Sequence, residues 1–303
     1  MIAIPLTQIG PSDNQNYEYH WTGEYIEAHL LSDVGHKRKS NQDACMLCVP
    51  QDDNLAHRRG LMFAVADGMG GANAGEFASR LALEALIEGY YLSASQNLPD
   101  RLRDALEEAS RQIFAEAEQN PERHGMGTTL SAFVVHGEWA YVAQVGDSRI
   151  YLVRPRHPIV QVTNDHSLVA EQVRNGYISP EEARTHSLKN LITRAVGIKE
   201  TVKVDLFCLH IQQGDTFLIC SDGLCNLVKD SEIEQALENE SLQSAARVLV
   251  GRALHEGGSD NITTAIIRVT AVPPPQTFEF GAEPVKVPKL GLMSRLGRLL
   301  TGG

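Results

Sequence analysis

Four apolar stretches of this chain each carry an aspartate at one end, and in three of them the aspartate is next to a glycine. The acids are Asp67 after residues 63–66, Asp147 after 142–145, Asp222 after 218–220 and Asp260 before 262–267. Such stretches are typical of buried β-strands. Acids at strand ends can converge at one edge of a sheet, where they repel one another unless cations lie between them. Oxygen ligands suit hard divalent ions such as Mg²⁺ and Mn²⁺, so the pattern predicts a metal-dependent enzyme.

The overall composition is that of an ordinary globular protein. Of its 303 residues, 43% are hydrophobic and 21% are charged, which is enough material for one large domain or two small ones. The net charge is −11 and the isoelectric point is near 5.5. This balance argues against a nucleic-acid-binding surface, because phosphate contacts depend on clustered Lys and Arg. Bound metals can still attract phosphoesters to an acidic site.

The sequence shows no signal for export or membrane insertion. The N-terminus has no basic segment, since the first Lys or Arg is Lys37. No apolar run approaches the roughly 18 residues that a membrane-spanning helix needs. We expect a cytoplasmic, monomeric protein.

The five cysteines indicate buried, reduced thiols, because their number is odd and most lie in apolar, strand-like segments. Cys45 and Cys48 have the spacing of a redox or zinc-binding pair, but no second pair accompanies them. On a strand, residues three apart point to opposite faces. Packing in the core is therefore the preferred interpretation.

Changes in composition divide the chain into three parts. Residues 1–25 are polar and rich in turns and are expected to form an N-terminal extension. The folded domain is expected over residues 26–271. The three prolines of 273–275 predict a stiff linker, so residues 272–303 are interpreted as a Pro-rich linker followed by a basic amphipathic tail.

The hydrophobic pattern within that domain predicts three consecutive strands. β-rich segments at 129–135, 139–145 and 149–153 are separated by glycine-containing turns, which predicts an antiparallel meander.

Helical periodicity covers residues 74–92, 101–118 and 242–254. Ser179, followed by Pro180 and by Glu182, has the spacing of a helix N-cap. Strands in hairpins and helices in consecutive blocks predict an α+β fold, with a central antiparallel β-sandwich flanked by helices.

The glycine-rich segment 68–71, with Gly75 beyond it, has two interpretations. A phosphate-binding loop is one, but the segment lacks the Gly-Lys-Ser/Thr ending of such loops and follows an acid. Alternatively, Gly68 offers its backbone carbonyl to a metal, and Asp67 bridges two ions with both carboxylate oxygens.

Six motifs in a fixed order point to a known family. They are residues 35–43 with Arg38, 67–71, 127–129, 146–149, 221–224 and 259–261. In this order and at these spacings, the chain resembles the type 2C metal-dependent protein phosphatase (PPM) family, and the resemblance extends from about residue 28 to 270.

The resemblance implies a four-layer αββα sandwich with a dinuclear Mg²⁺ or Mn²⁺ centre. Such a centre hydrolyses phosphoserine and phosphothreonine in proteins through a hydroxide that bridges the two ions, because the ion pair lowers the pKa of water toward about 7. The implied partners are phosphorylated proteins, the products of serine/threonine kinases.

The resemblance also implies roles for individual residues. Asp67 corresponds to the ligand that bridges both tightly bound ions, and Arg38 to the arginine that binds the substrate phosphate. The other implied roles are Gly68 as a carbonyl ligand, Asp222 and Asp260 as further ligands of one ion, Asp43 as the acid that serves the other ion largely through water, and Asp147 as a ligand of a third, weaker ion.

The sequence departs from the family at the general acid. Relatives carry a histidine after the Asp-Gly pair or after the Gly-Gly pair, where this chain has Met69 and Ala72. A water on the ion at Asp147 is the preferred proton donor. Gln42 stands where eukaryotic members have a glutamate, so the second metal is expected to rely more on water.

Residues 164–197 resemble the mobile flap of the bacterial members. His166 and His186 within this flap are alternative proton carriers, although a single histidine more often has a structural role.

Two alternatives to a protein phosphatase stay open. One is a catalytically silent pseudophosphatase that binds metal for regulation, although the retained acids and Arg38 speak against it. The other is a different two-metal hydrolase such as a nuclease, which the acidic composition disfavours.

The sequence of the tail predicts a separate interaction surface. Leucines fall on one face of a helix with basic residues around it: Leu292, Leu296, Leu299 and Leu300, with Lys289, Arg295 and Arg298. This pattern is compatible with peripheral membrane association or with docking on a protein. A disordered end is the alternative.

Overall fold

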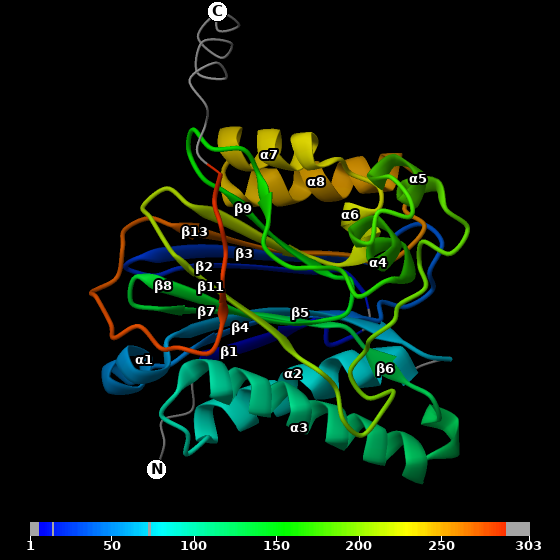
Figure 1. Ribbon diagram of the computed structural model, residues 1–303, viewed down its shortest axis with the longest axis horizontal. Helices are drawn as coiled ribbons and strands as arrows, with labels where there is room; N and C mark the ends of the chain where they lie inside the picture. Colours follow the sequence, from blue (N-terminus) through cyan, green and yellow to red (C-terminus); the bar gives the residue numbers. More distant parts are fainter. Residues whose placement is uncertain (1–5, 14, 72–73, 289–303) are drawn as a thin grey trace, which may run out of the picture.

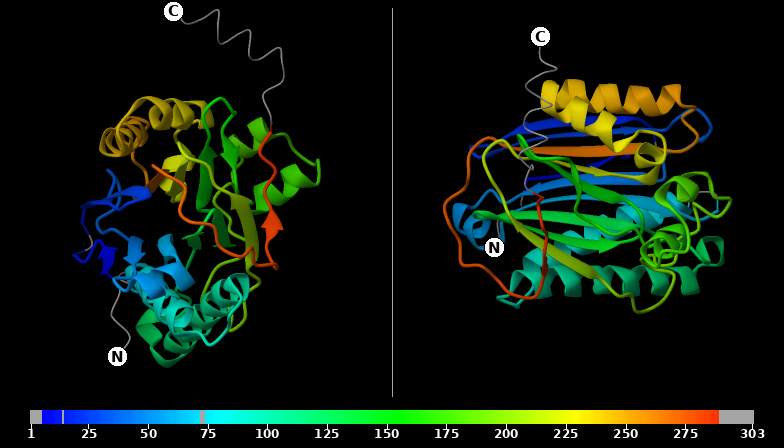
Figure 2. Two further views of the ribbon diagram at one scale, coloured as in Figure 1. Left: turned by 90° about the vertical axis from the view of Figure 1, so that its left-hand side faces the viewer. Right: turned by 45° about the horizontal axis from the view of Figure 1, so that its top comes forward.

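Two β-sheets stack face to face in the computed structural model, and a pair of long helices covers the outer face of each (Figure 1). The structure describes residues 6–13, 15–71 and 74–288. The views in Figure 2 show the same four layers from two further sides. The predicted α+β class and the sandwich flanked by helices are confirmed.

The first sheet contains β1 (Leu6–Gly10), β4 (Asp43–Val49), β5 (Leu61–Met69), β6 (Gly127–Thr128), β7 (Leu130–His136), β8 (Trp139–Val145), β11 (Asp205–His210) and β14 (Glu283–Pro284). Its order is β1-β4-β5-β7-β8-β11-β14, and β6 pairs with β5. The second sheet contains β2 (Tyr17–Thr22), β3 (Ile26–Asp33), β9 (Arg149–Val153), β10 (Val160–Gln161), β12 (Thr216–Cys220) and β13 (Ile262–Val269). Its order is β10-β9-β12-β13-β3-β2.

The long helices α2 (Ala74–Leu92) and α3 (Leu98–Gln119) cover the first sheet, and α7 (Asp230–Asn239) and α8 (Leu242–His255) cover the second (Figure 1). Shorter helices lie in the connections: α1 (Asp53–Arg59), η1 (Pro121–Arg123), α4 (Leu168–Arg174), α5 (Pro180–Thr185) and α6 (Asp222–Cys225). The three predicted helical stretches correspond to α2, α3 and α8. The predicted cap at Ser179 is the N-cap of α5 and forms a complete capping box with Glu182.

The apolar side chains of the described residues form three clusters, one between each pair of adjacent layers. Within β4, Cys45 and Leu47 belong to the cluster between the sheets, whereas Met46 and Cys48 belong to the cluster under α2 and α3. Alternate side chains of a strand face opposite sides, and both sides of β4 are covered, so its sequence after Asp43 is continuously apolar. The predicted core packing of the two cysteines is confirmed.

The predicted meander is wrong in its third strand. β7 and β8 form a hairpin, but β9 pairs with β10 and β12 in the other sheet. Gly146 permits the crossing, because its φ is 108° and a Cβ at this position would lie 2.5 Å from Cβ of Thr129. Asp147 consequently lies on the connection between the two sheets.

The packed domain is longer than predicted at both ends. Strands β1 and β2 pair with β4 and β3, so residues 6–10 and 17–22, expected in an extension, belong to the sandwich. Beyond the prolines, β14 pairs in parallel with β11, and the rings of Phe278 and Trp139 are 4.5 Å apart. Residues 276–287 therefore form a strap against the domain, visible in red-orange in Figure 1. The predicted tail helix lies outside the described residues.

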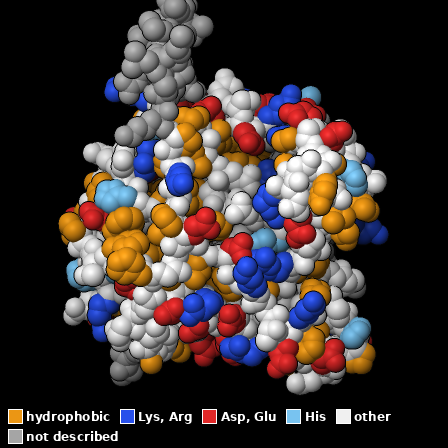
Figure 3. Space-filling model, viewed as in Figure 1, with side chains coloured by type: hydrophobic (Ala, Val, Ile, Leu, Met, Phe, Trp, Pro, Cys, Tyr) orange, Lys and Arg blue, Asp and Glu red, His pale blue; other side chains and the backbone are white. Residues whose placement is uncertain are grey.

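Acidic and basic side chains are interspersed on the face of the molecule shown in Figure 3. Among the residues that the structure describes, no helix combines the length and apolar character needed to cross a membrane.

Removal of the strap should destabilise the domain. Glu279 accepts a hydrogen bond from the N–H of Leu98 at the start of α3, where a helix favours negative charge, and Phe278 packs on Trp139. We expect truncation after Ala271 to lower the Tm, measured by circular dichroism, by roughly 4–8 °C, which corresponds to about 2 kcal/mol of lost contacts. Truncation after Pro288 keeps these contacts and is the matched control. Equal Tm values for the two proteins would contradict a structural role of the strap.

Candidate active site

The motif acids gather at one end of the sandwich, the end that carries α6 and the flap helices α4 and α5 in Figure 1. Asp43 and Asp67 are direct register partners on the adjacent strands β4 and β5. Asp222 begins α6, with one residue between it and the end of β12, and Asp260 precedes β13. Asp147 lies on the connection between β8 and β9. The topology therefore brings together the acids that the sequence pattern selected.

The Gly-Thr-Thr motif fixes the backbone at Asp67. The carbonyl oxygen of Asp67 accepts hydrogen bonds from Oγ1 of Thr128 and from the N–H of Thr129, each at 2.9 Å. The N–H of Asp67 donates to Oγ1 of Thr129 at 2.9 Å. The same Oγ1 lies 2.8 Å from Oγ of Ser148, next to Asp147. Thr129 thus ties the end of β5 to the crossing between the sheets.

Two glycines bring the start of α2 against the end of β5. A Cβ on Gly68 would lie 2.0 Å from the carbonyl oxygen of Gly75 and 2.6 Å from that of Gln42. A Cβ on Gly75 would lie 2.9 Å from the carbonyl oxygen of Gly68. The missing side chains allow this close approach of the two backbones.

Asn261 holds the loop that carries Arg38. Its Oδ1 accepts from the N–H of Gln42 at 2.8 Å, and its Nδ2 donates to two backbone oxygens of the loop at 2.9 and 3.1 Å. Arg38 reaches Asp260 with Nε 2.7 Å from Oδ1 and Nη2 2.8 Å from Oδ2. The guanidinium therefore lies at the edge of the acidic cluster, and 47% of the Arg38 side chain is exposed to solvent.

Burial and mutual repulsion raise the pKa values of the acids. Desolvation raises the pKa of Asp43 to about 7, although a hydrogen bond from Oγ of Ser221, at 2.7 Å, acts in the opposite direction. Desolvation also raises the pKa of Asp222 to about 6, against a hydrogen bond with Asp67. The pKa values of Asp67 and Asp147 are raised well above 3.8, again mainly by desolvation and then by neighbouring carboxylates.

This set of oxygens fits hard divalent cations. Oδ1 of Asp147 is buried and has no hydrogen-bond partner among the described residues, an arrangement that costs about 1–3 kcal/mol unless a partner is supplied. Cations would remove the repulsion among the buried carboxylates, and oxygen donors suit Mg²⁺ and Mn²⁺.

The acids are not preassembled around a single point. Within the described residues, no three His, Cys, Asp or Glu side chains form a ready-made metal site, and Arg38 contributes positive charge beside Asp260.

His166 holds the turn before Asp147 from the flap side. Its backbone N–H donates to the carbonyl oxygen of Gly146 at 3.0 Å, and its Nδ1 accepts from the N–H of Gly146 at 3.0 Å. Nδ1 is therefore the acceptor, and Nε2 donates to Oδ2 of Asp205 at 3.1 Å. This hydrogen bond is the largest cause of the lowered pKa of Asp205, about 2. The contacts favour a structural role for His166 over the predicted role of proton carrier.

Several of these supporting residues were not selected from the sequence. Asp205 begins β11 without a neighbouring glycine, so nothing marked it as a partner of the flap. The motif positions Thr129 and Asn261 were recognised, but their function as backbone anchors depends on contacts between distant segments. His186, the second predicted proton carrier, accepts through Nδ1 from the N–H of Leu188 at 3.1 Å.

Comparison with known proteins agrees with this site. The sequence profile of the family Protein phosphatase 2C matches residues 35–255. The serine/threonine phosphatase stp of Listeria monocytogenes is 37% identical over 247 residues, which cover 80% of this chain and 95% of that protein.

Solved structures give the same result. Serine/threonine phosphatase Stp1 from Staphylococcus aureus has a TM-score of 0.75 at 33% identity, covering 82% of this chain and 96% of the other. The catalytic domain of PstP, solved with two manganese ions, has a TM-score of 0.70 at 34% identity, covering 82% and 99%. The resemblance seen in the sequence motifs is confirmed, and the chain belongs to the protein phosphatase 2C family.

Proposed function

We propose that this chain is a metal-dependent protein serine/threonine phosphatase that hydrolyses phosphoserine and phosphothreonine in proteins. The observation that carries this function is the group of buried acids beside an exposed arginine at one end of the sandwich. Relatives named serine/threonine phosphatase, similar over four-fifths of the chain, support the reaction and the class of substrate.

Two tightly bound Mg²⁺ or Mn²⁺ ions are proposed for the acidic cluster. Asp67 would serve as a ligand of both, and the other ligands would be the Gly68 carbonyl, Asp222, Asp260 and, largely through water, Asp43. When bound, such a pair of ions lowers the pKa of water toward about 7 and offsets the charge of phosphoryl oxygens. The two manganese ions in the PstP catalytic domain are consistent with this number.

Arg38 is proposed to bind the phosphate of the substrate. Its planar guanidinium matches two oxygens of one group, as its contact with both oxygens of Asp260 illustrates. The loop that carries it is anchored through Asn261, so the guanidinium is positioned at the entrance to the acids. Retention of Arg38 and the buried acids favours catalysis over the silent pseudophosphatase.

Asp147 is proposed to bind a third, weaker cation. Its unpartnered Oδ1 offers a ligand, and its place on the crossing separates it from the strand positions of Asp43 and Asp67. A water near Asp147 is the preferred proton donor for the departing Ser or Thr oxygen, because Met69 and Ala72 replace the family histidines and both ring nitrogens of His166 are engaged.

Replacement of Asp67 tests the proposed function directly. Asp67→Asn keeps the shape of the side chain but removes the charge that would bridge the ions. We expect Mn²⁺-dependent hydrolysis of p-nitrophenyl phosphate to fall by at least ~10²-fold, with an unchanged circular dichroism spectrum. Glu200→Gln, at an exposed acid outside the site, is the matched control. Turnover by Asp67→Asn close to that of the control would reject the assignment.

The third ion predicts a different outcome at Asp147. In Asp147→Ala, isothermal titration calorimetry should detect the two tight Mn²⁺ sites but lose the weak one, and hydrolysis of a phosphopeptide should fall by roughly tenfold or more. An unchanged number of sites together with full activity would show that Asp147 holds no ion needed for the reaction.

The raised pKa values predict how pH and metal act on stability. Because Asp43 and Asp222 bind protons more tightly when folded, their contribution to the free energy of unfolding without metal is fully present below about pH 4 and is lost as pH rises through 6–7. Cations offset the charge and compete with protons, so the Tm gain from Mn²⁺ should be larger near about pH 8 than near about pH 5. A gain that is equal at both pH values, or larger at the lower pH, would argue against cation binding by these acids.

A further inference from the structure

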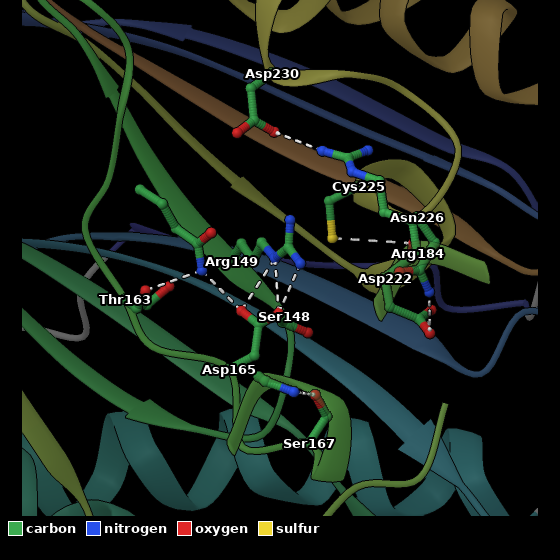
Figure 4. A network of polar contacts seen from close by, with 12 residues as sticks. Ser148, Arg149, Thr163, Asp165, Ser167, Arg184, Asp222, Cys225, Asn226 and Asp230 are labelled. Carbon is green, nitrogen blue, oxygen red and sulfur yellow. Dashed lines mark hydrogen bonds and ion pairs between the residues drawn. The ribbon is translucent and has the colours of Figure 1, made fainter. Parts of the chain in front are cut away.

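A cavity of about 390 Å³ adjoins the acidic cluster beneath the flap. It lies between the strands β9 and β10, the helix α6 and the flap helices α4 and α5, and Figure 4 shows the polar side chains around it. Asp147 and Asn226 line the side nearest the site, and Asn226 Nδ2 donates to Oδ2 of Asp222 at 3.1 Å. A substrate segment next to the phosphorylated residue would therefore meet this cavity.

The floor of the cavity is polar, and its charges are paired with each other. Arg149 contacts Asp165 through Nε, at 3.0 Å from each carboxylate oxygen, and through Nη2, at 2.7 Å from Oδ2. Its Nη1 donates to the hydroxyl of Tyr151 at 2.9 Å. Gln161 donates to Oδ1 of Asp165 at 2.8 Å. This ion pair, visible at the centre of Figure 4, needs no charge from a ligand.

The flap supplies cations that are not matched in this way. Arg184 has Asp230 as its carboxylate partner, but at 4.0 Å and with 52% of its side chain exposed. Arg174 donates to a backbone oxygen, that of Asp165, at 3.0 Å. Lys189 also lines the cavity and has no ion-pair partner among the described residues. Arg174, Arg184 and Lys189 of the flap thus share the cavity with the acids Asp147 and Asp230, beside an ion pair that is already neutral.

The walls of the cavity suit a short aliphatic stem. Small apolar side chains of α4 and α5 line it: Val169, Ala170, Val173, Pro180 and Ala183. Altogether the lining contains four basic and three acidic side chains, a local excess of positive charge in a chain of net charge −11. Apolar walls with cations at the rim match a side chain that ends in an anionic group.

We propose that this cavity is a subsite for an anionic side chain of the protein substrate, located near the phosphorylated residue in its sequence. The group is a carboxylate or a second phosphate, and Arg184 and Lys189 select it. This inference rests on the proposed function, because it concerns the substrate of the same site. It makes the phosphatase selective for phosphorylation sites in acidic or multiply phosphorylated segments.

The test uses phosphothreonine peptides that differ at one flanking position, which carries Asp, a non-hydrolysable phosphonate analogue of phosphoserine, Ala or Lys in turn. For each protein, kcat/KM is measured with Mn²⁺ and divided by its own rate on p-nitrophenyl phosphate, which has no flanking residues. We expect the wild type to prefer Asp over Lys by roughly five- to tenfold at one or two positions, as two partly exposed ion pairs allow. The phosphonate peptides, whose flanking group cannot be hydrolysed, show whether a phosphate-like group is preferred to carboxylate.

Charge-reversal variants test whether Arg184 and Lys189 cause the preference for Asp. The double variant Arg184→Glu/Lys189→Glu should lose the preference for Asp or favour Lys, whereas Lys199→Glu, at an exposed residue outside the lining, should keep it. Equal kcat/KM of the wild type on Asp and Lys peptides at every position would overturn the subsite, and so would an unchanged preference in the double variant.

A measurement on the wild type alone covers the case in which the double variant does not fold. The preference for Asp should shrink several-fold as salt rises from about 0.05 to 0.5 M, because exposed ion pairs are screened. A preference that is independent of salt would overturn the subsite. Absence of any Mn²⁺-dependent hydrolysis by the wild type would instead reject the proposed function.

Discussion

The repulsion among buried carboxylates at one end of the sandwich is the constraint on which the rest of the structure depends. Asp43 and Asp67 face each other across β4 and β5, and burial, together with the charges of Asp260 and Asp222, raises the pKa of Asp43 to about 7. Such a group opposes folding when charged. The folded state tolerates this buried charge because three apolar clusters stabilise the sandwich independently and because cations can bind the acids.

The motif residues that are not acids keep these acids in place. Thr129 forms hydrogen bonds with both the N–H and the carbonyl oxygen of Asp67, and it also contacts Ser148. Asn261 ties the Arg38 loop to the strand that follows Asp260. A shift of about 1 Å at such a site can cost on the order of 10²-fold in rate. Their role is therefore to fix the distance between groups that would otherwise move apart.

The sequence was sufficient for the fold class, for the helices α2, α3 and α8 and for the choice of the acids, because each depends on local periodicity or on a motif read along the chain, but it did not predict α7. Prediction from the sequence failed for elements whose position depends on tertiary contacts. Along the sequence, β9 continues the hairpin pattern of β8, but in the structure it joins the other sheet. Only the φ of Gly146 and its close approach to Thr129 reveal this crossing. The strap has no periodic pattern, and its place depends on the exposed edge of β11. The flap cavity likewise depends on residues far apart in sequence.

The central claim is that the acidic cluster binds divalent cations and that these ions make the chain a phosphatase. The most direct test is the rate of p-nitrophenyl phosphate hydrolysis by metal-stripped protein as Mn²⁺ is added back. The account predicts no hydrolysis in the presence of a chelator and a saturable rise in rate with added Mn²⁺. The same rate in chelator, or no hydrolysis at saturating Mn²⁺, would contradict it.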